Sequence, residues 1–80
     1  MDERMKEKVL DLLAEVCEDE VVKEDLDMDL VGSDLLDSLA FAEFLALIEE
    51  ELDIVIPPSE YDRKVLNTPA AILEAVARLS

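Results

Sequence analysis

Residues 37–52 have the sequence DSLAFAEFLALIEEEL, which carries the most regular apolar spacing in the chain. Its apolar side chains recur at intervals of four, three and four residues. Such spacing places them on one face of an α-helix, which we predict over residues 38–52. Asp37 or Ser38 can accept a hydrogen bond from the first-turn amides, and Asp53 with two prolines beyond it marks the end. The apolar face consists of Phe41, Leu45, Ile48 and Leu52, with Phe44 beside them.

The segments on either side extend this pattern into an all-α fold. Apolar residues at helical intervals predict a first helix over residues 3–17, capped by Asp2, and a last helix that begins with Thr68-Pro69. Residues 18–29 are crowded with acids and lack a sustained period, so we expect a long loop there. We expect an extended segment at residues 54–56 and a short helix at 59–63. The prediction is a four-helix bundle of three longer helices and one short helix, with a long loop between the first two and residues 1–80 in a single domain.

Composition limits the functions that this chain can have. Its 80 residues include 22 acids and 7 bases, for a formal charge of -15, yet 51% of the residues are hydrophobic. An acidic surface repels the phosphates of nucleic acids and anionic membranes, which leaves basic proteins as partners. Without histidine, and with Cys17 as the only cysteine, we expect no catalytic activity. The sequence shows no secretory signal or membrane span, so we expect a cytoplasmic monomer that does not insert into membranes.

Two groups of acids suggest a metal site or an acid–base site, and the sequence argues against both. The aspartates of residues 25–29 alternate like the first ligands of a calcium loop, but Leu30 and Leu36 stand where that loop requires glycine and glutamate. The acids of residues 43–51 are better explained as a solvated helix face, because no pocket that would separate their pKa values is indicated. We therefore predict no metal site and no catalytic carboxylate.

Two smaller features have ordinary structural explanations. Cys17 lies beside an acid near a helix end, where nothing lowers the pKa of its thiol, so we interpret it as a small, partly buried residue. Arg63-Lys64 is the only basic pair in the C-terminal half, and we expect ion pairs with Glu60 and Asp62. The alternative for Arg63-Lys64 is a contact with a partner or a cargo.

Ser38 is the remaining candidate functional residue, and spacing alone favours a structural helix cap. The alternative is an attachment point. A hydroxyl at the first residue of a helix projects toward solvent beside the positive end of the helix dipole, where an attached phosphoryl group is favoured. Asp37 and the acids along the helix would then offer a patch that a basic modifying enzyme recognises.

The order of these features along the chain resembles the acyl and peptidyl carrier protein family. The similar features are Asp37-Ser38-Leu39 at the start of the second long helix, the acids of residues 43–51, the sequence LDIVIP at residues 52–57, and Thr68-Pro69. The resemblance implies a carrier-protein bundle in which Ser38 bears covalent 4'-phosphopantetheine, placed there from coenzyme A by a phosphopantetheinyl transferase. It also implies that the terminal thiol holds a cargo as a thioester and that the chemistry occurs in partner enzymes.

The resemblance also implies a partner surface and a subgroup. The subgroup is that of the D-alanyl carriers, which deliver D-alanine for esterification of teichoic acids. The likeness to this subgroup rests on the sequence PPSEYDR at residues 57–63 and on Asn67-Thr68. The partners would then include an adenylating ligase that loads the cargo and a downstream acyltransferase, which can be membrane-bound. In the family, acids and apolar residues along the helix predicted at residues 38–52 contact basic partners, and the matching residues are Asp37, Leu39, Ala42, Glu43, Ala46, Glu49 and Glu50.

Two alternatives stay open on the sequence. Within the family, the cargo can instead be a fatty-acyl or another aminoacyl group of a dedicated pathway. Two departures from the D-alanyl subgroup bear on this choice: Gly32 lies further from Ser38 than is usual, and Leu66 replaces an aromatic residue. Outside the family, the chain can be an acidic adaptor that binds a basic partner noncovalently through residues 38–52, with Ser38 only a cap.

Overall fold

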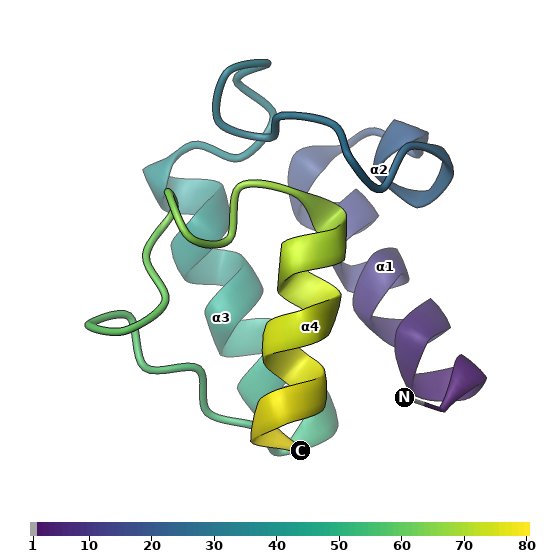
Figure 1. The fold of residues 1–80 in the computed structure, drawn as a ribbon, viewed down its shortest axis with the longest axis vertical. Helices are drawn as coiled ribbons and strands as arrows, with labels where there is room; N and C mark the ends of the chain where they lie inside the picture. The colour runs from purple at the N-terminus through teal and green to yellow at the C-terminus, as the bar shows by residue number, and fades with distance from the viewer. Residues whose placement is uncertain (1) are drawn as a thin grey trace.

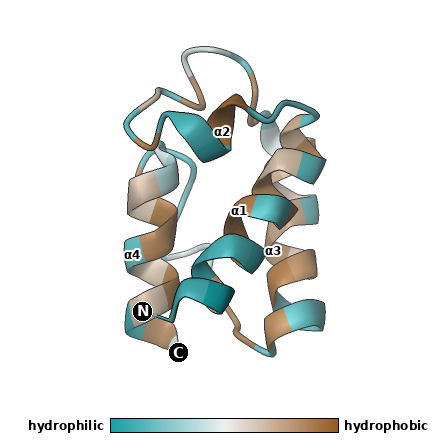
Figure 2. Cartoon of the chain, turned by 90° about the vertical axis from the view of Figure 1, so that its right-hand side faces the viewer, coloured by the Kyte–Doolittle hydropathy of each residue, from teal (hydrophilic) through white to brown (hydrophobic). Residues whose placement is uncertain are grey.

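The computed structural model describes residues 2–80, and within that range it contains helices and no strand. The helices are α1 (Glu3–Cys17), α2 (Val21–Glu24), α3 (Ser38–Leu52) and α4 (Pro69–Leu79). α1 packs against the other three helices, and in Figure 2 it lies between α4 and α3. This arrangement confirms the predicted all-α fold (Figure 1). None of the helices in the described range is long and apolar enough to cross a membrane.

α1 and α3 have the predicted bounds, and α4 begins where the last helix was predicted to begin. Each begins with a side-chain oxygen that accepts a hydrogen bond from a first-turn amide, and these oxygens belong to Asp2, Asp37 and Thr68 at distances of 2.9, 2.7 and 3.1 Å. α1 and α3 end at Glu18 and Asp53, both in the left-handed conformation with φ of 56°. Glycine is the residue that usually ends a helix in this way, so two acids hold a backbone conformation that favours glycine.

The apolar faces of the helices meet in one core. Fully buried side chains come from α1 (Leu13), from α3 (Phe44 and Ile48) and from α4 (Ile72 and Val76). No polar or charged side chain of the described residues is buried. Because each large apolar side chain contributes about 1.5–3 kcal/mol when it is buried, the core fixes which face of α3 is turned inward and which is left to solvent.

The segment between α1 and α3 differs from the prediction, because residues 21–24 form the one-turn helix α2 inside the expected loop of residues 18–29. A carboxylate oxygen of Asp19 accepts the amide hydrogen of Val21 at 3.0 Å, and the side chain of Val22 is fully buried. A single turn is too short to show an apolar period, so only the three-dimensional contacts identify it.

The segment between α3 and α4 is extended at residues 54–56, as predicted, but the short helix predicted at 59–63 is wrong. The carbonyl of Pro57 accepts two amides and closes a single turn, and a second turn begins at Asp62. The Asp62 carboxylate accepts the amides of the second and third residues after it, each at 3.0 Å. An aspartate that bonds to the backbone in this way competes with helix formation, so two separate turns result.

The loop before α3 is bound to the segment before α4. The backbone carbonyl of Asn67 accepts the amide of Leu30 at 2.8 Å, and its side-chain oxygen accepts the amide of Val31 at 3.2 Å. The amide of Ala70 donates to the carbonyl of Leu26 at 2.9 Å. The two segments lie in the upper half of Figure 1, and the bonds of Asn67 and Ala70 help to fix the loop that leads into α3.

Candidate functional site

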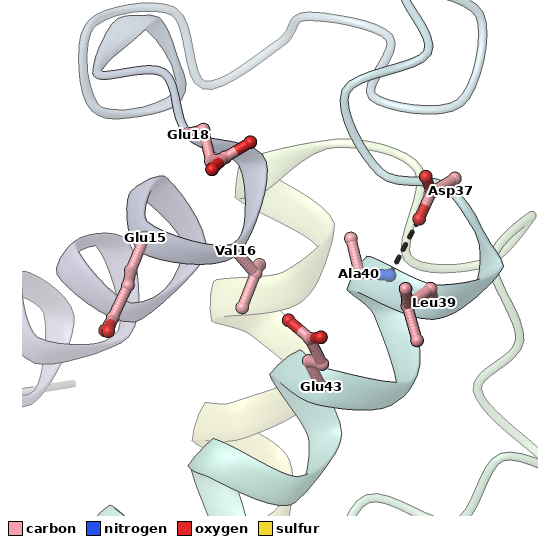
Figure 3. A pocket seen from close by; sticks show the side chains of 7 residues that line it. All are labelled: Glu15, Val16, Glu18, Asp37, Leu39, Ala40 and Glu43. Atoms are coloured by element: carbon pink, nitrogen blue, oxygen red, sulfur yellow. Dashed lines mark hydrogen bonds between the residues drawn. The ribbon is translucent and has the colours of Figure 1, made fainter.

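Ser38 is the first residue of α3, and its side chain is exposed. Asp37, and not Ser38, caps the helix: its Oδ1 accepts the amide hydrogen of Ala40 at 2.7 Å, as the dashed line in Figure 3 marks. Within residues 2–80 the Ser38 hydroxyl makes no hydrogen bond. The structural role that the sequence offered to Ser38 is therefore filled by its neighbour, and the hydroxyl is available at the surface.

A hollow of about 270 Å³ lies between the end of α1 and the start of α3. We call it the α1-side hollow. In Figure 3 the carboxylate of Glu43 is turned toward the end of α1, where Val16 and Glu18 lie. The lining contains four carboxylates and is completed by small or apolar residues: Glu15, Val16, Glu18, Asp37, Leu39, Ala40 and Glu43.

A second hollow of about 390 Å³ lies on the opposite flank of α3, against the segment that connects α3 to α4. We call it the Arg63-side hollow. Apolar groups of α3 and of the two loops line it, together with two cations and one carboxylate: Val31, Phe41, Pro58, Arg63, Lys64 and Asp62. Cations suit a phosphate, and apolar groups suit an aliphatic chain, so this donor set fits a phosphorylated aliphatic group attached nearby.

Arg63 is held against the start of α3. Its Nη1 donates to the carbonyl of Leu36, two residues before Ser38, at 3.2 Å. The predicted ion pairs of Arg63-Lys64 with Glu60 and Asp62 are wrong, since the described residues include no carboxylate within 4.0 Å of either cation. The Asp62 carboxylate is occupied by backbone amides, which explains why it does not pair with its neighbour.

The predicted partner residues lie together on the outward face of α3. All are exposed, and the most exposed large apolar side chain is Leu39, at 68%. The helix period places the α3 members within about one third of the circumference. Glu51 lies outside this face and forms an ion pair with Lys8 of α1 at 3.0 Å. The outward stripe, as we call it, consists of Leu39, Ala42, Glu43, Ala46, Glu49 and Glu50, with Asp37 at its start.

The acids of the loop have local structural roles. The carboxylate of Asp25 accepts the amide of Asp27 at 3.2 Å, and that of Asp29 accepts the amide of Gly32 at 2.8 Å. In the part of the chain that the structure describes, no group of three or more potential ligands is arranged to hold a metal ion. These aspartates therefore shape turns, as such side chains commonly do.

The sequence predicted a partly buried Cys17, and the structure places it in a buried position at the end of α1. Burial, followed by the negative charges of Asp19 and Asp37, raises the pKa of its thiol from the ordinary 9.0 to about 11. A thiol that stays protonated at neutral pH is a weak nucleophile, so Cys17 is a core residue and does not compete with an attached thiol.

Sequence reasoning missed two residues that position the site. Arg63 contacts a carbonyl 27 residues away, and Asn67 holds the loop before α3 through two acceptors. Both residues lie in stretches that already carried the family resemblance, which was the available signal. Nothing in their local sequence indicates which distant backbone groups they contact.

A small helical fold with an available serine hydroxyl at a helix start is the architecture of a carrier domain, and the comparisons with known proteins agree. The phosphopantetheine attachment site family matches residues 7–76. The D-alanyl carrier protein of Bacillus subtilis (strain 168) is 46% identical over 74 residues, which cover 92% of this chain and 95% of that protein. The D-alanyl carrier protein of Abiotrophia defectiva is 45% identical over 74 residues, or 92% and 94% of the two chains.

The chain belongs to the phosphopantetheine attachment site family. Such a domain is the site of covalent 4'-phosphopantetheine attachment, and its members are carriers without catalytic activity of their own. Membership also implies contact with a phosphopantetheinyl transferase and with enzymes that load and transfer the cargo. The noncovalent adaptor that the sequence left open is thereby replaced by a covalent carrier.

Proposed function

We propose that residues 1–80 form a single carrier domain that bears 4'-phosphopantetheine on Ser38 and transports D-alanine for esterification of teichoic acids. The observation that carries the attachment site is the exposed Ser38 hydroxyl, which is available because Asp37 supplies the helix cap. When bound, the group supplies a terminal thiol that forms a thioester with the cargo. The cargo is supported by relatives named D-alanyl carrier protein, which are 40–46% identical to this chain.

The filled core supports a small cargo. Phe44, Ile48 and Ile72 are fully buried, and they occupy the interior between α1, α3 and α4. A long acyl chain could enter this interior only by displacing side chains from a close-packed arrangement, which is unfavourable. A D-alanyl group requires no such space, because it can remain at the end of the arm.

The outward stripe supports docking of basic partners. Its carboxylates, from Glu43, Glu49 and Glu50, surround the small apolar surface of Leu39, Ala42 and Ala46. Charged groups around an apolar centre accelerate association and select the partner. We propose that a phosphopantetheinyl transferase, a D-alanine-adenylating ligase and a membrane-bound acyltransferase use this surface in turn, with Asp37 beside the reacting group.

The attachment site is tested by incubating the protein with coenzyme A, magnesium and a broad-specificity phosphopantetheinyl transferase, followed by intact-mass measurement. The unmodified protein should gain one phosphopantetheine, and Ser38→Ala should gain none. Ser59→Ala is the matched control, because Ser59 is exposed and makes no hydrogen bond among the described residues. Labelling of Ser38→Ala, or no labelling of the wild type while a known carrier is labelled in parallel, would contradict the proposal.

A further inference from the structure

We propose that the prosthetic group on Ser38 lies in the Arg63-side hollow, with its phosphate bound by Arg63 and Lys64. The α1-side hollow and the outward stripe then remain open to partners. The inference rests on the proposed function, because it requires the group to be attached to Ser38. It goes further by assigning the side of α3 on which the group lies and the residues that hold it.

The two hollows beside the start of α3 have opposite charge. Four carboxylates line the α1-side hollow, and within residues 2–80 none of them forms an ion pair. The Arg63-side hollow has Arg63 and Lys64 against Asp62, whose carboxylate already accepts two amides. The phosphodiester that forms on Ser38 carries a negative charge, so it is repelled by the first hollow and attracted by the second.

The position of Arg63 suits a phosphate on Ser38. The guanidinium has five N–H donors. One of them, on Nη1, donates to the carbonyl of Leu36 at 3.2 Å, and Leu36 is two residues before Ser38 in the chain. The other donors remain for phosphate oxygens, which guanidinium groups bind well. Lys64 makes no side-chain hydrogen bond or ion pair in the described part of the chain, so its ammonium group is a second available cation.

The hollow also has an apolar lining, and one of its residues lies on α3 one turn after Ser38. Phe41 follows Ser38 by three residues, so the two side chains share a face with about 5–6 Å between their Cβ atoms. Val31 and Pro58 complete the apolar lining from the two loops. The hollow therefore offers an apolar surface for the aliphatic portion of the arm beside the two cations.

Nuclear magnetic resonance of the ¹⁵N-labelled protein tests this placement. Intact mass first establishes that the sample carries phosphopantetheine, and amide shifts are then compared before and after modification. We expect changes at Val31, Phe41 and residues 58–66, and we expect the amides of residues 63–66 to exchange with solvent about two- to fivefold more slowly after modification. Added salt should reduce these changes, because Lys64 is exposed and Arg63 is only half-buried.

Substitutions identify the cations. Arg63→Gln should diminish the modification-dependent shifts at residues 58–66, and Arg63→Lys should restore part of them. Lys64→Gln should also diminish them, and it removes no hydrogen bond of the fold, so it gives a result even where Arg63→Gln disturbs the loop. The matched control is Arg4→Gln, which removes the same charge from the exposed first turn of α1.

Three results would overturn the inference. Shift changes at residues 15–18, without changes at Val31 and residues 58–66, would place the group in the α1-side hollow. Shift changes confined to residues 37–39 would leave it in solvent. Modification-dependent shift changes at residues 58–66 that are as large in both Arg63→Gln and Lys64→Gln as in the wild type would show that neither cation binds the phosphate. A protein that gains no mass would instead contradict the proposed function, and the inference with it.

Discussion

Asp37 combines a structural role with a recognition role, and two substitutions separate them. Its Oδ1 accepts the Ala40 amide at 2.7 Å, and its carboxylate lines the α1-side hollow beside Ser38. Asp37→Ala removes both the cap and the charge. Asp37→Ser removes the same charge but keeps a side chain that caps helices about as well as aspartate does. Both variants change the net charge of -15 by the same amount, so relief of self-repulsion cancels in the comparison.

The expected difference in stability follows from the cap alone. Replacement of an N-cap residue by alanine costs about 0.5–2 kcal/mol, most often about 1 kcal/mol. For a domain of this size, 1 kcal/mol corresponds to about 4–8 °C in melting temperature. We therefore expect Asp37→Ala to melt about 4–8 °C below Asp37→Ser, because the first turn of α3 loses its only side-chain cap.

Thermal denaturation followed by far-ultraviolet circular dichroism measures this difference, and the rate of phosphopantetheine transfer provides the second readout. Asp37→Ser should keep a folded α3 and lose only the part of the transfer rate that depends on charge, whereas Asp37→Ala should lose more because Ser38 then lies in a frayed turn. Equal melting temperatures for the two variants would refute the assignment of the cap to Asp37.

Three further predictions follow from the surface, the core and a helix end. Glu43→Lys should slow transfer onto Ser38 several-fold at low salt by slowing association, whereas Glu7→Lys on α1 should leave the rate unchanged; equal rates for the two variants would exclude the outward stripe from recognition. Because burial raises the Cys17 pKa to about 11, the unfolded chain loses this proton first, so stability should fall from about pH 9 to pH 11. A fall of the same size in Cys17→Ala would contradict that cause. Asp53→Gly should raise stability by about 1 kcal/mol, because it relieves a left-handed residue at φ 56° and removes a negative charge from a helix C-terminus. Asp53→Asn, which removes only the charge, should gain less.

The long helices were predictable because several local signals coincide at each end. α3 has an apolar face of about four turns, an aspartate at its start, and Asp53 with two prolines beyond it at its end. The single turns were not predictable, because no set of coinciding local signals marks them. α2 and the turns of residues 57–66 depend on individual bonds from Asp19 and Asp62 to the backbone, and these leave no period in the sequence.

The site was predictable where it depends on one helix and not where it depends on contacts between segments. The place of Ser38 at the start of α3 follows from the spacing of that helix, and the choice of the residues of the outward stripe follows from the family resemblance. Arg63 was assigned to its sequence neighbours, but its guanidinium contacts Leu36, because the tie between Asn67 and the loop before α3 brings the two segments together. A tertiary contact of this kind overrides the pairing that local charge suggests.

The most direct test of the account measures which cargo the modified protein accepts. The holo protein and Ser38→Ala are each incubated with ATP and a ligase that adenylates D-alanine, and in parallel with an enzyme that loads fatty acids, and the Ser38 peptide is analysed by tandem mass spectrometry. We predict a D-alanyl thioester on the phosphopantetheine of Ser38, formed with a higher kcat/KM than any fatty-acyl product and absent from Ser38→Ala. Preferential fatty-acyl loading, or D-alanine attached anywhere other than at Ser38, would contradict the account.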